Sequence, residues 1–79
     1  MKIKLFAQLK EAAGTDEIEI PLKEPLTVDQ VAELIARTEP RLAPFLKTAK
    51  VAVNMEISSG QRRVEAGDEI ALLPPFSGG

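Results

Sequence analysis

The last six residues of this 79-residue chain offer its clearest chemistry: Pro74, Pro75, Phe76, Ser77, Gly78 and Gly79. Prolines cannot donate to a strand ladder, so this pair ends the preceding apolar run and sends the chain out as a stiff, extended arm. Glycine has no Cβ, so a diglycine end can enter a passage too narrow for other residues. The pattern favours a terminal carboxylate that is itself the reacting group. The simpler alternative is an unconstrained chain end, but a buried strand, two prolines and an aromatic residue argue against it.

The rest of the chain is poor in catalytic groups. Cys, His and Tyr are all absent, which removes the commonest nucleophile and general base, any disulfide and a plausible zinc site. Glu65, Asp68 and Glu69 form an acidic cluster, but a hard cation needs about six oxygen ligands, so we interpret them as a solvated turn. The sequence therefore predicts no bound metal and no enzyme on its own; the catalytic groups are expected on a partner.

Composition limits the class further. The chain is 44% hydrophobic with a net charge of −2, which is typical of one small globular domain. Lys and Arg are scattered, so no basic stripe indicates nucleic acid. No apolar run reaches membrane-spanning length, and the start lacks a signal region. We expect a cytoplasmic protein with neither nucleic acid nor a membrane as partner.

Several elements must position the arm. Alternating or continuous apolar residues predict strands at 2–7, 15–22, 51–57, 61–64 and 69–73. Residues 8–13 predict a short helix closed by Gly14. The main helix begins at Thr27, where Gln30 completes a capping box, and ends before Pro40. This order predicts an α+β domain with one main helix across a mixed sheet.

Phe6 breaks the alternation of the first strand. Lys2 and Lys4 alternate with Ile3 and Leu5, which places Phe6 in phase with the lysines, on the face that should meet water. Either its ring packs under a neighbouring loop or it belongs to a partner-binding patch.

Four stretches together resemble one family: Leu72 to Gly79, Leu5 to Gly14, Ala52-Val53-Asn54, and Gly67 to Ile70. They are similar to the small subunits of molybdopterin synthase (MoaD proteins), which are ubiquitin-like sulfur carriers. The resemblance implies a ubiquitin-like β-grasp at residues 1–73, with the first and last strands side by side, and a reactive tail at 74–79. Phe76 stands where a smaller aliphatic residue is expected.

The resemblance also implies the chemistry. A separate E1-like activating enzyme, supplied with ATP and magnesium, would adenylate Gly79, and sulfide would displace AMP to leave a thiocarboxylate (1-thioglycine). The chain itself would bind no cofactor. The tail, with Gly78 threading behind Gly79, would enter the large catalytic subunit and give sulfur to a pyranopterin precursor, in an assembly of two carriers and two large subunits.

The partner-binding residues predicted on this basis are Phe6, Leu73, Pro74, Pro75, Phe76 and Ser77. Three alternatives remain open at this point. The carrier could serve another pathway, namely thiamin, cysteine or tRNA thiolation. The chain could be a ubiquitin-like modifier whose Gly79 becomes an amide on a lysine, because an acyl adenylate accepts an amine as well as a sulfide. It could also be a binding module with an inert terminus.

Overall fold

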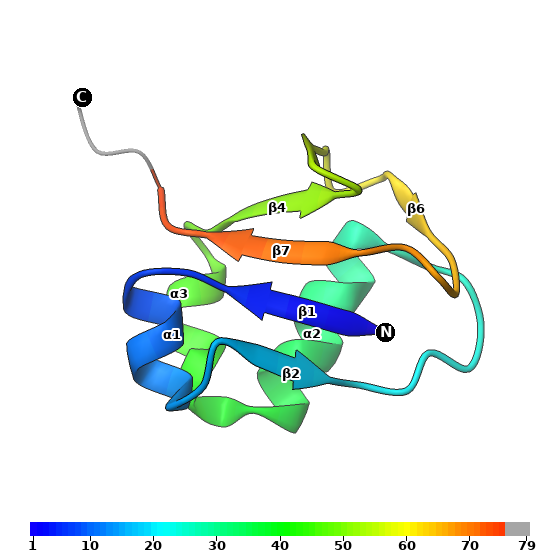
Figure 1. Cartoon of the computed structure of the whole chain (residues 1–79). Coiled ribbons are helices and arrows are strands. Elements are labelled where there is room, and N and C mark those ends of the chain that lie inside the picture. The colour runs from blue at the N-terminus through cyan, green and yellow to red at the C-terminus, as the bar shows by residue number, and fades with distance from the viewer. Residues whose placement is uncertain (76–79) are drawn as a thin grey trace.

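The computed structural model describes residues 1–75 and consists of a five-stranded mixed sheet with helices packed on one face (Figure 1). The strand order is β2-β1-β7-β4-β5. The strands of this sheet are β1 (Lys2–Leu5), β2 (Glu17–Glu19), β4 (Lys50–Val53), β5 (Glu56–Ile57) and β7 (Ile70–Leu73). Only β1 and β7 pair in parallel, and the other neighbours are antiparallel. The predicted α+β class is confirmed, and so is the ubiquitin-like β-grasp that the family resemblance implies, with the first and last strands side by side.

The helices follow the predicted capping chemistry. In α2 (Val28–Thr38), the Thr27 hydroxyl accepts from the Gln30 backbone N–H at 3.2 Å, and the Gln30 side chain accepts from the Thr27 N–H at 2.9 Å. Helix α1 (Gln8–Ala13) ends at Gly14, whose φ of 76° is left-handed. A 3₁₀ turn, η1 (Pro40–Leu42), and α3 (Ala43–Leu46) follow α2. No helix in residues 1–75 is long and apolar enough to cross a membrane.

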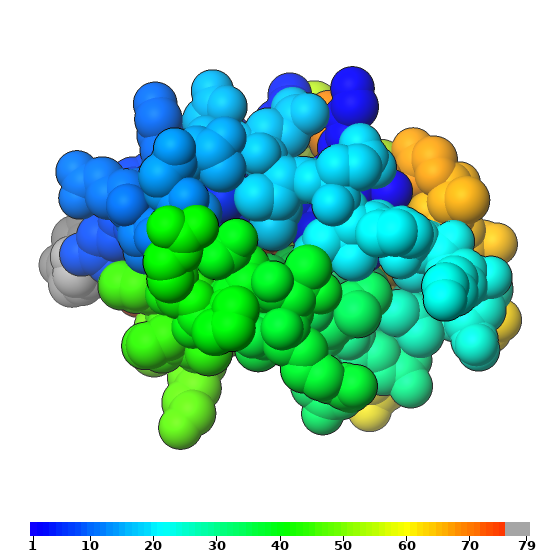
Figure 2. Space-filling model, turned by 90° about the horizontal axis from the view of Figure 1, so that it is seen from below, coloured from blue at the N-terminus to red at the C-terminus, as the bar shows by residue number. Residues whose placement is uncertain are grey.

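The core lies between the inner face of the sheet and the helices. The alternation of β1 and β7 turns their aliphatic side chains to this face, where α2 contributes three more. Seen from below, the blue and cyan segments from α1 to the loop after β2 lie directly against the green segments of the later helices (Figure 2). The buried cluster comprises Ile3, Leu5, Leu9, Ala13, Ile20, Val28, Val31, Ile35, Leu42, Val53, Val64, Ile70 and Leu72.

Two predicted strands are organised differently in the structure. Residues 51–57 are not one strand, because β4 ends at Val53 and the chain reverses through Asn54 and Met55 into β5. Both turn residues have positive φ, 52° and 71°, as a two-residue hairpin turn requires. The 61–64 segment provides β6 (Arg63–Val64), which pairs with β3 (Leu26–Thr27) in a separate two-stranded sheet. The prediction missed β3 because two residues give no periodicity.

Candidate functional site

The root of the predicted tail lies at the end of a central strand. Strand β7 is hydrogen-bonded to β1 on one side and to β4 on the other, and it ends at Leu73. Pro74 is half-buried and Pro75 exposed, and neither belongs to a strand, as expected for residues that cannot donate to a ladder. The predicted residues Phe76, Ser77, Gly78 and Gly79 lie outside the described part of the chain. Their roles stay predictions.

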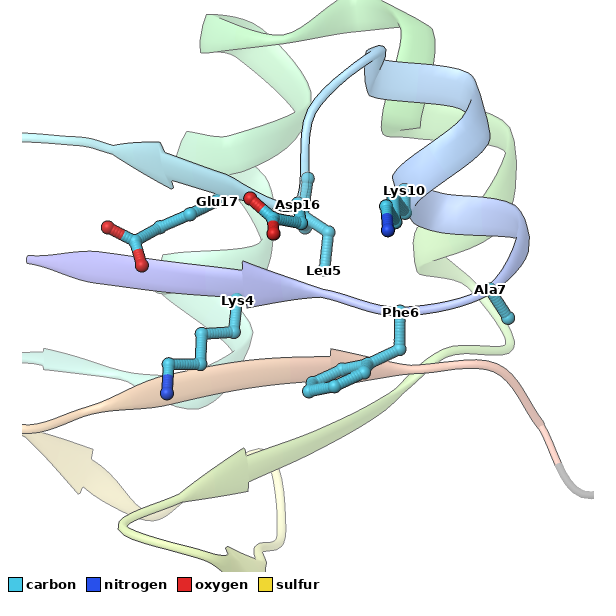
Figure 3. A pocket seen from close by; sticks show the side chains of 7 residues that line it. All are labelled: Lys4, Leu5, Phe6, Ala7, Lys10, Asp16 and Glu17. Carbon is cyan, nitrogen blue, oxygen red and sulfur yellow. The ribbon is translucent and has the colours of Figure 1, made fainter.

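Phe6 and Leu73 lie side by side on the outer face of the sheet. Leu5 pairs with Leu72 in the parallel ladder, so the next residue of each segment falls in the following row and faces outward. Phe6 is 44% exposed, and its ring extends toward β7 (Figure 3). This placement of Phe6 and Leu73 follows from the predicted pairing of the first and last strands, and Phe6 is not covered by a loop of residues 1–75.

Three more apolar residues continue this surface across the sheet. Ala71 pairs with Ala52, and Ala52 pairs with Ile57 on the edge strand. Ala52 is only 5% exposed but does not belong to the core cluster, which agrees with a position on the opposite face of the sheet. Ile57 is 57% exposed. We call these five residues the outer patch: Phe6, Leu73, Ala71, Ala52 and Ile57.

Charged residues border the outer patch. Lys4 lies beside Ala71, and its Nζ is 3.4 Å from Glu69 Oε2. Both side chains are about half exposed, so the pair adds little stability. Lys50 pairs with Leu73 and is exposed. The patch is thus an apolar area with lysines on two sides, and its Phe6–Leu73 end lies where the tail begins.

An open hollow of about 530 Å³ adjoins Phe6 (Figure 3). Its charged lining comes from β1, α1 and the start of β2, and consists of Lys4, Lys10, Asp16 and Glu17. All four side chains are exposed to solvent. Within residues 1–75, no group of three or more acidic, His or Cys residues could hold a metal ion.

A hydrogen-bonded pair ties the β4–β5 turn to the loop before β7. Asn54 Nδ2 donates to Asp68 Oδ1 at 3.0 Å, and Asn54 Oδ1 accepts from the Glu69 N–H at 2.9 Å. Asp68 Oδ2 accepts from the Glu65 N–H at 2.8 Å. We call this arrangement the Asn54–Asp68 clasp. The bond from the Glu65 backbone, reinforced by that from Asn54, holds the pKa of Asp68 below its ordinary value.

The sequence model of the ThiS family matches residues 3–79 of this chain. The chain belongs to the ThiS family. A molybdopterin synthase sulfur carrier subunit from Dictyostelium discoideum is 37% identical over 82 residues, a match that covers 99% of this chain and 94% of that protein. The crystal structure of SAMP1 from Haloferax volcanii superposes with a TM-score of 0.83 at 30% identity, covering 99% of this chain and 97% of that one.

A third comparison concerns a complex. The protein-protein complex of subunits 1 and 2 of the molybdopterin-converting factor from Helicobacter pylori contains a chain that superposes with a TM-score of 0.67. The match covers 99% of this chain and 96% of that one. At 20% identity it supports the shared fold of this ThiS-family chain and no more.

Sequence analysis of this ThiS-family chain missed one exposed apolar residue. Ile57 was counted with Val51, Val53 and Met55 in one alternating strand, whereas the turn between β4 and β5 places it on the outer face. The available signal was Asn54, because asparagine tolerates the left-handed conformation that such turns need. Met55 lies at the tip of the same turn and is 90% exposed.

Proposed function

We propose that this chain is the sulfur carrier subunit of a molybdopterin synthase and that it acts through its C-terminal Gly79. The observation that carries the proposal is the full-length match to a protein of that name at 37% identity. The match to the ThiS family model runs through residue 79, so it includes the diglycine. The chain supplies the reacting group, and other proteins supply the acid and base groups.

The proposed chemistry begins with a carboxylate that is inert until one oxygen becomes a leaving group. The Gly79 carboxylate attacks the α-phosphorus of ATP on the activating enzyme and releases pyrophosphate. Sulfide, drawn from a persulfide donor and released by a thiol reductant, then attacks the carbonyl carbon. A C–S bond forms and the C–O bond to AMP breaks. The thiocarboxylate is an anion at neutral pH, so it needs no general base in the carrier to become a nucleophile.

The proposed second partner is the large catalytic subunit, which receives the charged tail and supplies the pyranopterin precursor. Fixing the backbone of a residue in one conformation costs roughly 1 to 2 kcal/mol, and insertion of the tail incurs this cost for each residue that it immobilises. Contact with the outer patch, together with backbone pairing along the tail, offsets this cost. The observation in favour of docking here is that Phe6, beside the tail root, is 44% exposed, and that Ile57, at the far end of the same patch, is 57% exposed.

Intact mass after incubation with ATP, magnesium, the activating enzyme and a sulfur source tests the chemistry. We expect one terminal oxygen to be exchanged for sulfur. Oxidation of Met1 or Met55 changes the mass by nearly the same amount, so fragmentation must place the change at Gly79. Modification elsewhere, or none, would reject the proposal.

A shortened chain without Gly78 and Gly79 is the matched control. We expect it to keep the melting temperature of the full chain, because the structure places the core within residues 3–72, and to lose sulfur transfer completely. Normal rates of molybdopterin synthesis with this chain would show that its end is not the reagent. If a strain that lacks the gene for this chain, and has no paralogue, keeps full activity of a molybdoenzyme, the carrier would instead serve thiamin, cysteine or tRNA thiolation.

A second candidate is a protein modifier. It is favoured by the similarity to the small archaeal modifier protein 1 of Haloferax volcanii, which is 31% identical over 87 residues. The same adenylate would then be attacked by a lysine amine, releasing AMP and leaving an amide. Proteomic recovery of lysines that bear this tail would support the modifier, and their absence together with a thiocarboxylate at Gly79 would support the carrier.

A further inference from the structure

The β4–β5 hairpin is too short to specify its own register. Strand β5 has two residues and forms two residue pairs with β4, and one further backbone bond, from the Ser58 N–H to the Val51 carbonyl at 2.9 Å, follows them. A slip of one residue in such a ladder would move each side chain to the other face of the sheet. Ile57 would then leave the outer patch and turn to the inner face. Something other than strand pairing must hold the turn.

The backbone conformation of the turn is intrinsically unfavourable. Asn54 and Met55 both have positive φ. Positive φ is uncommon for residues other than glycine, and methionine lacks the short polar side chain that helps asparagine to adopt it. Strained conformations of this kind persist only where the surroundings hold them. In the described part of the chain, Asn54 is held by the clasp and by the backbone bond from its N–H to the Glu69 carbonyl at 2.8 Å.

We propose that Asn54 and Asp68 are positioning residues, whose side-chain hydrogen bond fixes the β4–β5 turn and thereby holds Ile57 in the outer patch for the protein that docks there. The inference rests on the proposed function, because it needs a docking partner. It explains why two segments about fourteen residues apart in the chain contribute a polar pair to an exposed site.

The geometry allows the two residues to be exchanged. In Asn54→Asp, a carboxylate replaces the donor that faces Asp68, so the bond is lost and two like charges meet. In the double variant Asn54→Asp with Asp68→Asn, the new amide donates to the new carboxylate. The carboxylate still accepts from Glu69, and the amide oxygen still accepts from Glu65. The double variant therefore keeps every hydrogen bond of the clasp and the net charge of the chain.

The test measures the dissociation constant of the complex with the large subunit by titration calorimetry. We expect Asn54→Asp to weaken binding roughly 3- to 10-fold and the exchanged pair to bind within about twofold of wild type. In an Ile57→Ala background, Asn54→Asp should have less than about a twofold effect, because the residue that it positions is gone. NMR contacts between the Ile57 and Ala52 methyl groups should weaken in Asn54→Asp and return in the exchanged pair.

Unchanged affinity in a folded Asn54→Asp variant would overturn the inference. An equal loss with and without Ile57 would also do so, since the clasp would then act by another route. If Asn54→Asp does not fold, Asp68→Asn and the exchanged pair form the comparison. Failure of the wild type to bind the large subunit would instead reject the proposed function. In that case, the same variants are measured for binding to the activating enzyme, which both candidate functions require. If the wild type binds neither partner, the inference is rejected as well.

Discussion

Removal of the Phe6 ring should separate docking from folding. A phenylalanine side chain presents about 150 to 250 Å², so its 44% exposed fraction corresponds to about 65 to 110 Å² that a partner can cover. At about 25 cal/mol per Å², this area is worth about 2 kcal/mol. Phe6→Ala should therefore raise the dissociation constant of the complex with the large subunit roughly 30-fold.

Titration calorimetry of wild type and Phe6→Ala against the large subunit measures this change. Phe45→Ala is the matched control, because Phe45 is also partly buried but packs against the core cluster from α3, on the opposite side of the sheet from the outer patch. We expect Phe45→Ala to lower the melting temperature and to leave the affinity of the folded protein unchanged.

Binding of folded Phe6→Ala within about threefold of wild type would contradict this prediction, since it limits the contribution of the Phe6 ring to less than about 0.7 kcal/mol. The outer patch would then not be the docking surface. A loss of similar size in Phe45→Ala would also contradict it, because affinity would then follow general stability and not the covered area of one face.

Three further predictions concern stability. Thr27→Ala removes the α2 cap and should lower the unfolding free energy by about 1 kcal/mol in urea titrations. Gly14→Ala places a Cβ at a φ of 76° and should also cost about 1 kcal/mol, with Gly14→Asn milder. Hydrogen bonds from Glu65 and Asn54 lower the pKa of Asp68 in the folded protein. The stabilisation that the Asp68 carboxylate provides is therefore complete above about pH 4 and is lost as the carboxylate becomes protonated at lower pH. Asp68→Asn should therefore lose less stability than wild type between about pH 4 and 2.

Local chemistry explains which parts of the fold were predictable. The capping box at Thr27 and the glycine that ends α1 are specified by neighbouring residues, so short-range rules are sufficient for them. The parallel pairing of β1 with β7 is different, because no local pattern in either strand identifies its partner. It was predicted from family resemblance alone.

The incorrect assignment of residues 51–57 has a physical cause. A two-residue turn with positive φ preserves a run of alternating apolar residues while reversing the chain, so Ile57 reads as a continuation of β4 in sequence although it lies on the edge strand. Its place on the outer face follows from its pairing with Ala52 across the turn, and the clasp that we propose to hold this turn joins residues fourteen apart in the chain. Periodicity detects neither the turn nor the clasp.

The size of the outer patch links docking to the state of the tail. A stable complex buries about 20 to 30 residues on each side, whereas the patch has five, two of which are alanines. The patch can therefore orient a partner but cannot hold it alone, and the six residues of the tail add to the contact. The tail also carries the proposed reacting group. We therefore expect the affinity for the large subunit to differ between the carboxylate and the thiocarboxylate forms of Gly79. A carrier that must leave to be recharged requires this dependence.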